Sequence, residues 1–235
     1  MIDEIKNIEI RYAKRSNDLE TSSVVPLHRM YAHQEKERAF LAYLRRYPIS
    51  QLSLLKFLEI GCGYGHNLTQ FVRWGFDPCN MIGSELLPDR TEIARHFLPP
   101  SISIVTGDSS TLDIPAESMD IVLISTVFSS ILDDLFQEKL ASVVWDLVRP
   151  GGAILWYDFI FNNPQNQDVR GVPRARIEQL FPRAKISLKR VTLAPPIARA
   201  LAKCPPPMYA VANMFPFFRS HVIGSIVKPA SGNRT

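Results

Sequence analysis

A glycine-rich segment supplies the clearest chemistry in this sequence. Gly61, Gly63 and Gly65 follow the apolar run at residues 57–60, and Glu59 lies two residues before the first glycine. Glycines between a buried strand and a helix let the backbone approach a ligand closely, as in nucleotide-binding loops. The segment therefore predicts a site for a nucleotide-like ligand. The structural alternative is a tight strand-to-helix turn that holds nothing.

The spacing of these glycines distinguishes two kinds of ligand. A dinucleotide-binding loop has the pattern Gly-x-Gly-x-x-Gly and directs a helix N-terminus at a pyrophosphate. Here the third glycine comes one residue early, and His66 stands where that glycine would be. A nicotinamide-dependent oxidoreductase on a similar fold is therefore the disfavoured enzyme interpretation, kept as an alternative.

Polar residues also follow the next two predicted strands. Glu85 ends the second strand, where a carboxylate can accept hydrogen bonds from both hydroxyls of a ribose. Asp108 and Ser109 follow the third strand, in a Gly-Asp-Ser stretch that a simple turn also favours. Since parallel strands end at one edge of a sheet, these side chains are expected to share a site with the glycines.

The segment at residues 56–160 resembles the Rossmann-like, or class I, S-adenosylmethionine-dependent methyltransferases. The sequences EIGCGYG, GDS, DIVLIS and LVRPGG occur in it in the family's order. The resemblance implies that Glu59 accepts hydrogen bonds at the amino end of S-adenosylmethionine, directly or through water, and that Asp108 accepts one from its adenine. The expected cofactor-binding residues are Glu59, Gly61, Gly63, Gly65, Asn67, Glu85, Leu86, Asp108, Ser109 and Ser125.

Methyl transfer requires a positioned nucleophile and, for a hydroxyl acceptor, a base that removes its proton. Asp158 is one candidate because it ends the fifth predicted strand, although an aspartate there could also cap a loop. His28 and His33 are the others, since they lie in an N-terminal segment that covers the cofactor in many relatives. The histidines and cysteines lack zinc spacing, and no metal is expected.

Short apolar runs alternating with amphipathic segments predict an α/β fold with a mostly parallel, seven-stranded Rossmann-like sheet covered by helices on both faces. Five runs are predicted strands, and residues 186–193 and 221–227 complete the sheet. Residues 1–50 are predicted to form a peripheral helical cap whose last helix ends at Pro48, and residues 51–235 the cofactor-binding domain. Within it, the apolar, proline-rich segment 194–218 is expected to act as a lid. The five apolar runs that are predicted to be strands are residues 57–60, 81–85, 102–106, 120–125 and 152–158.

The composition of the 235 residues, with 46% hydrophobic and 21% charged side chains, is typical of a globular protein. The three scattered cysteines and the lack of a signal-peptide profile or a membrane-length apolar run favour a cytoplasmic location. The charge is uneven: residues 1–169 carry a net −7, whereas residues 170–235 carry +11. This basic third favours a phosphate-bearing or otherwise acidic partner, or is a solvated surface.

The run YDFIFNNPQNQDVRGVPRARIEQLFP also resembles small methyltransferases associated with glycan assembly. The leading hypothesis is therefore a methyltransferase that acts on a small-molecule or glycan-linked acceptor, with a hydroxyl as the expected nucleophile. Carbon, nitrogen and carboxylate acceptors remain open. A non-catalytic module that binds anionic surfaces or nucleic acid is the remaining alternative, motivated by the basic third and the apolar segment 194–218; nucleic acid is the weaker expectation.

Overall fold

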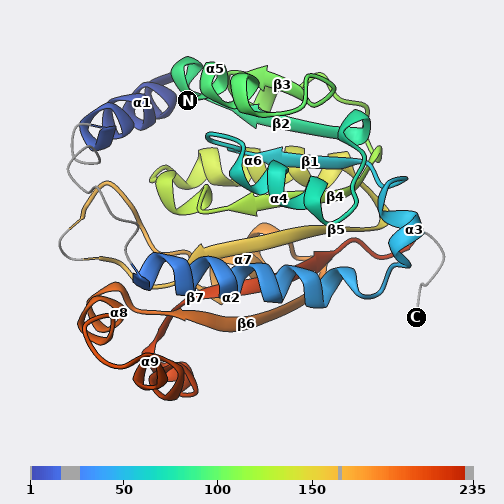
Figure 1. Ribbon diagram of the computed structural model, residues 1–235. Coiled ribbons are helices and arrows are strands. Elements are labelled where there is room, and N and C mark those ends of the chain that lie inside the picture. The colour runs from blue at the N-terminus through green and yellow to red at the C-terminus, as the bar shows by residue number, and fades with distance from the viewer. Residues whose placement is uncertain (1, 17–26, 164–165, 231–235) are drawn as a thin grey trace.

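The computed structural model describes residues 2–16, 27–163 and 166–230, so residues 1 and 17–26 of the predicted cap lie outside it. Within the described residues, a seven-stranded sheet has helices on both faces, which confirms the predicted Rossmann-like α/β fold (Figure 1). The strand order is β3-β2-β1-β4-β5-β7-β6. The strands are β1 (Phe57–Ile60), β2 (Met81–Glu85), β3 (Ser103–Thr106), β4 (Met119–Ser125), β5 (Val148–Phe159), β6 (Lys185–Leu193) and β7 (Arg219–Val227).

Strands β1 to β5 pair in parallel, and β7 inserts antiparallel between β5 and β6. The prediction of parallel strands that are apolar on both faces holds for β1 and β4 but fails for β3. In β3 only Ile104 is buried, because this strand forms the edge of the sheet and has a neighbour on one side alone. The carboxyl ends of the five parallel strands lie along one edge of the sheet, which is where ligands bind in open α/β folds.

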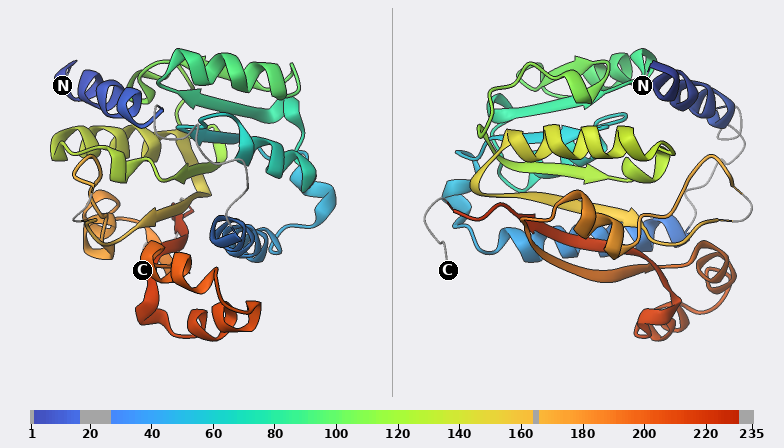
Figure 2. Two further views of the ribbon diagram at one scale, coloured as in Figure 1. Left: turned by 60° about the vertical axis from the view of Figure 1, so that its left-hand side comes forward. Right: turned by 180° about the vertical axis from the view of Figure 1, so that it is seen from behind.

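The helices cover the sheet in two layers (Figure 2). Alternate residues of a strand point to opposite faces, so Leu58 and Ile60 pack with α1, α6 and α7, whereas Phe57 packs with α2, α4 and α5. The helices are α1 (Ile2–Ser16), α2 (Leu27–Leu44), α3 (Ile49–Leu52), α4 (His66–Arg73), α5 (Pro88–Phe97), α6 (Asp134–Leu147), α7 (Arg174–Leu180), α8 (Pro195–Leu201) and α9 (Pro206–Asn213).

Helix α2 ends at Leu44, four residues before Pro48, where the sequence predicts its end. Its buried residues Phe40 and Leu44 belong to the same core as the strand residue Phe57, so α2 packs on the sheet rather than lying at the periphery. The proline-rich segment 194–218 forms α8, α9 and a short 3-10 helix, Pro216–Phe218. Among the described helices, none has the length and apolar character needed to cross a bilayer.

Candidate functional site

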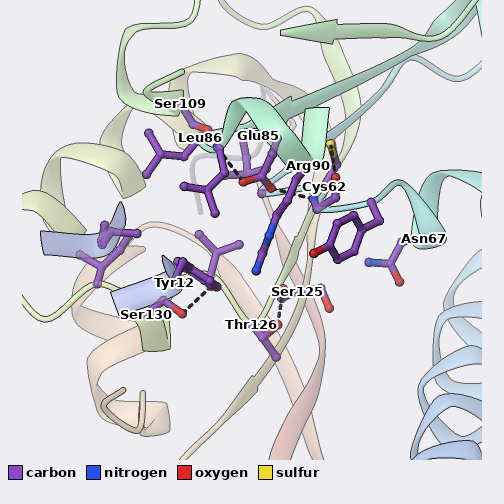
Figure 3. Close-up of a pocket in the computed structure, with 18 of the residues that line it drawn as sticks. Tyr12, Cys62, Asn67, Glu85, Leu86, Arg90, Ser109, Ser125, Thr126 and Ser130 are labelled. Carbon is purple, nitrogen blue, oxygen red and sulfur yellow. Dashed lines mark hydrogen bonds between the residues drawn. The ribbon is translucent and has the colours of Figure 1, made fainter. Parts of the chain in front are cut away.

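A cavity of about 290 Å³ lies at the carboxyl edge of the sheet, and residues of α1 and α2 contribute to its lining. The loops after β1, β2, β3 and β4 all contribute side chains to it (Figure 3). Its volume is close to the lower limit of about 300 Å³ for ligand pockets. Eight of the predicted cofactor-binding residues line it: Gly61, Gly63, Asn67, Glu85, Leu86, Asp108, Ser109 and Ser125.

The glycine loop after β1 forms one wall of this cavity. Gly61 and Gly63 have φ values of +65° and +57°, a conformation that residues with a Cβ rarely adopt. A Cβ on Gly61 would lie 2.7 Å from Cγ2 of Val127, whereas a Cβ on Gly63 would meet nothing within 4 Å. Gly63 therefore leaves a bare stretch of backbone facing the cavity. Gly65 lies outside the lining and caps the N-terminus of α4 at φ +83°.

Glu85 ends β2 and is held by backbone amides on both sides. The N–H of Gly63 donates to Oε2 at 2.8 Å, and the N–H of Leu87 donates to Oε1 at 3.0 Å. The residue is only 5% exposed and lines the cavity. A carboxylate oxygen can accept two hydrogen bonds, so each oxygen of Glu85 retains one acceptor position. This geometry suits a pair of ligand hydroxyls.

Glu59 is fully buried and is not among the residues that line the cavity, so its contact with a cofactor, direct or through water, stays a prediction. Its Oε1 accepts a hydrogen bond of 2.6 Å from Nδ2 of Asn67, whose Oδ1 accepts one of 2.9 Å from Nζ of Lys36. Its Oε2 has no partner among the described residues. Burial raises the pKa of Glu59 to about 8, while the Asn67 hydrogen bond and the Lys36 charge oppose this rise. Asn67 and Lys36 line the cavity, so Glu59 reaches it only through them.

Asp108 and Ser109 line the cavity where β3 ends, but their polar atoms already have partners. Asp108 accepts hydrogen bonds from the N–H and the hydroxyl of Ser110, at 2.8 and 2.6 Å, and so caps a short 3-10 helix. The Oγ atoms of Ser109 and Ser84 lie 2.7 Å apart. Each Asp108 oxygen keeps one acceptor position, so the turn and an adenine contact are compatible.

The three candidate bases lie in different surroundings. Asp158 is fully buried outside the cavity lining, and its oxygens accept the N–H groups of Ser129 and Phe159 at 3.0 and 2.9 Å. Burial raises the pKa of Asp158 to about 7. His28 is also absent from the lining, whereas His33 contributes to it. Burial, followed by the charge of Lys36, lowers the pKa of His33, so its imidazole is neutral at pH 7.

Several lining residues were missed by sequence reasoning. The guanidinium of Arg90 lies 4.4 Å from the ring centre of Tyr12 and 5.3 Å from that of Tyr64. In Figure 3 the Arg90 side chain extends into the middle of the cavity, between Tyr12 and Asn67. Arg90 lies in the first turn of α5, five residues after Glu85, and this proximity to a strand end was the only sequence signal for it. Lys36 lies in a charged run of α2, and no sequence signal indicated that it would line the cavity.

Helix α1 closes one side of the cavity through polar contacts with the loop after β4. The buried Glu4 accepts hydrogen bonds from Arg11 and from the N–H of Leu132, both at 2.8 Å. Arg11 also donates to the carbonyl of Ser130 at 2.9 Å, and the hydroxyls of Tyr12 and Ser130 lie 2.9 Å apart. None of the described residues of the proline-rich segment 194–218 lines this cavity. Its assignment as a lid stays a prediction.

Comparison with known proteins identifies the central part of the chain. Residues 57–152 match the family model of a methyltransferase domain. The sterol 24-C-methyltransferase of Debaryomyces hansenii is 26% identical over 121 residues, which cover 48% of this chain and 30% of that enzyme. The chain therefore spans less than a third of that relative's length.

Two solved structures share the fold at low sequence identity. A Thermotoga maritima S-adenosylmethionine-dependent methyltransferase superposes with a TM-score of 0.64 at 15% identity, covering 94% of this chain and 98% of that one. A Haemonchus contortus phosphoethanolamine N-methyltransferase, in complex with phosphoethanolamine and S-adenosylhomocysteine, gives 0.63 at 13% identity and covers 98% of this chain and 50% of that one. The central segment 57–152 is therefore similar to a methyltransferase domain, and the two solved structures show that the chain shares their Rossmann-like fold.

Proposed function

We propose that this protein methylates a hydroxyl group of a small-molecule or glycan-linked acceptor, with S-adenosylmethionine as the methyl donor. The observation that carries the proposal is the bare backbone at Gly63 lying beside the carboxylate of Glu85 in the wall of one cavity. Backbone without a side chain admits a close ligand, and the carboxylate presents two acceptor positions beside it. Both features fit the ribose of an adenosyl group.

The remaining lining residues fit the other parts of this cofactor. Leu86, Ser109 and Asp108 lie at the ends of β2 and β3 and are proposed to surround the adenine. Asn67 and Lys36 lie at the start of α4 and on α2, and are proposed to bind the amino acid end. S-adenosylmethionine supplies a methyl group on a sulfonium cation, which a positioned nucleophile attacks in line.

His33 is the proposed base for the acceptor hydroxyl. It lines the cavity, and its lowered pKa keeps the imidazole able to accept a proton at pH 7. Asp158 is enclosed by backbone groups and lacks such access, so we propose that it positions the loop after β4 through Ser129. The His33 side chain is supplied by α2, so this assignment requires α2 to stay packed on the sheet.

The charge of the C-terminal third and the family resemblance together favour one acceptor class. The net +11 of residues 170–235 favours an acceptor or carrier with phosphate groups. One fold relative binds phosphoethanolamine, and the resemblance of residues 157–182 to glycan-associated methyltransferases favours a sugar hydroxyl. Calorimetric titration with S-adenosylmethionine, S-adenosylhomocysteine and NAD tests the cofactor first: we expect the first two to bind and NAD not to. Binding of NAD alone would contradict the proposal and favour the oxidoreductase alternative.

A further inference from the structure

The segment from Pro195 to Phe218 forms a small lobe, called here the C-terminal lobe, that projects beyond the sheet edge at β6 (Figures 1 and 2). The inner face of α9 anchors the lobe to α2. The rings of Tyr209 and Tyr31 lie 4.3 Å apart, and Nδ2 of Asn213 donates to Oε1 of Glu35 at 2.6 Å. The lobe is therefore fixed in orientation by its inner face.

The outer face of the C-terminal lobe is apolar and exposed. Met208, Val211 and Met214 recur every three residues, opposite Tyr209, and are 48%, 56% and 73% exposed. Phe215 and Phe217 follow, at 46% and 65% exposed, with ring centres 5.6 Å apart. Large apolar side chains that gather on one exposed face mark an interaction surface.

Exposed cations, called here the charged rim, lie on the lobe and on α2, against which the lobe packs. Arg199 and Lys203 on the lobe and Arg29 and Arg38 on α2 are exposed, and within the described residues none of the four forms a salt bridge. Arg38 lines one surface hollow together with Met214, which joins the charged rim to the apolar face.

Carboxylates do not balance this rim. Residues 179–235 include no Asp or Glu in the sequence. Glu35, which lines the same hollow as Met214, has both oxygens engaged: Oε2 accepts the N–H of Thr192 at 2.8 Å, and Oε1 accepts from Asn213. The surface thus combines exposed aromatic and thioether side chains with unpaired positive charge.

We propose that the C-terminal lobe docks on an anionic membrane surface. Met214, Phe215 and Phe217 would enter the boundary between headgroups and acyl chains, while Arg199 and Lys203 contact lipid phosphates. A symmetric contact with a second copy of this chain fits less well, because it would bring the cationic rims of the two copies together. Exposed phenylalanines beside basic residues fit the interface of an anionic bilayer, which offers both apolar and negatively charged groups.

The register of the sheet places this surface at the edge that holds the cavity. The lobe leaves the sheet at Leu193 and returns at Arg219, and these two residues pair across β6 and β7. His221, two residues further along, pairs with Phe159 at the carboxyl end of β5. A docked lobe therefore turns the carboxyl edge of the sheet toward the membrane.

Vesicle co-sedimentation of the full chain tests the proposal. We expect wild type to bind phosphatidylcholine vesicles containing about one third phosphatidylglycerol, and to bind pure phosphatidylcholine at least about tenfold more weakly. The variant Met214→Ser/Phe217→Ser should lose about tenfold in affinity for the anionic vesicles. Its matched control, Phe97→Ser/Leu135→Ser, removes side chains that are 74% and 72% exposed elsewhere and should bind as wild type does.

The charge reversal Arg199→Glu/Lys203→Glu should abolish the preference for anionic vesicles, whereas Arg45→Glu/Lys56→Glu, at exposed sites near the opposite edge of the sheet, should keep it. Should the lobe variant unfold, Met214→Glu alone replaces one 73% exposed side chain and serves in its place.

The proposal would be overturned if the lobe variants bound the anionic vesicles as tightly as their controls do. It would also be overturned if wild type bound vesicles with and without phosphatidylglycerol equally. A wild-type dimer that Met214→Ser/Phe217→Ser converts to a monomer in light scattering would also overturn it, and would assign the face to a second copy. The vesicle assay contains no methyl donor, so its outcome is independent of the proposed methyl transfer.

Discussion

The backbone N–H of Gly63 donates to Oε2 of Glu85 at 2.8 Å and joins the loop after β1 to the end of β2. Together with the N–H of Leu87 on the other oxygen, it fixes the carboxylate at the cavity wall before any ligand arrives. A fixed acceptor requires little rearrangement when it binds a hydroxyl pair, which favours affinity.

Replacing the glycines of the loop should separate stability from ligand binding. Gly61→Ala is expected to lower the free energy of unfolding more than Gly63→Ala, in urea titration. Both variants pay about 1–2 kcal/mol for a left-handed backbone, but only Gly61→Ala places a methyl group 2.7 Å from Val127. Gly63→Ala should instead weaken S-adenosylmethionine, since its methyl would project into unfilled space beside the ligand. Equal losses of stability would contradict the packing seen at Gly61.

Glu59→Gln should change how stability depends on pH. Burial raises the pKa of Glu59 from about 4.5 when unfolded to about 8 when folded, so the folded state holds an extra proton between these values. Its contribution to stability is complete below pH 4.5 and is lost as the pH rises through 8. A neutral glutamine keeps the hydrogen bond from Asn67 and lacks this loss. In urea unfolding, the stability of the variant relative to wild type should be greater at about pH 9 than at about pH 5. If the stabilities of the two proteins changed equally with pH, the raised pKa of Glu59 would be contradicted.

His33→Gln should reduce kcat by about 10²-fold or more, because a general base contributes on this scale. The activity of wild type should rise with pH through the lowered pKa of His33, with an acid limb below the usual value of about 6.5. Release of S-adenosylhomocysteine with a panel of sugar and sugar-phosphate acceptors measures both effects. His28→Gln, outside the cavity lining, is the control. An acid limb that survives in His33→Gln would assign it to another group.

Asp158→Asn should mainly affect stability. The substitution turns an amide NH₂ toward the backbone N–H of Ser129 or Phe159, and an unmatched buried donor costs about 1–3 kcal/mol. Asp113→Asn, at an exposed position, provides the control in chemical unfolding. A stable Asp158→Asn protein without activity would contradict this expectation and support the prediction from the sequence that Asp158 is the base.

The central strands could be predicted because burial on both faces leaves a largely apolar run, as in VLI and, apart from the buried Glu59, in FLEI. The second strand and its terminal Glu85 were located by the same signal. Strand β5 begins at Val148, four residues before the predicted start, because its first residues pair with β4 across a bulge that has no apolar signature. The end of α2 was placed at Pro48, although the helix stops at Leu44 and a turn precedes the proline.

The family resemblance led to His33 on α2, but two charged residues of the cavity wall, Lys36 and Arg90, could not be predicted. Lys36 lies in a charged run that resembles a solvated helix surface, and its partner Asn67 is 31 residues away along the chain. Likewise, the guanidinium of Arg90 lies 4.4 Å from the ring centre of Tyr12 only because α1 packs beside α5 in the fold. Local sequence patterns report which residues are buried in an element, but contacts between distant elements depend on how those elements pack.

The most direct test of the site is the affinity of Glu85→Ala for S-adenosylmethionine and S-adenosylhomocysteine, measured by calorimetry beside Glu92→Ala. Glu92 is an exposed carboxylate on α5 close to the same loop. Loss of charged hydrogen bonds should weaken both ligands by about 1.5–3 kcal/mol in Glu85→Ala, with Glu92→Ala unchanged. Wild-type affinity in a folded Glu85→Ala protein would contradict the assignment of this cavity as the cofactor site.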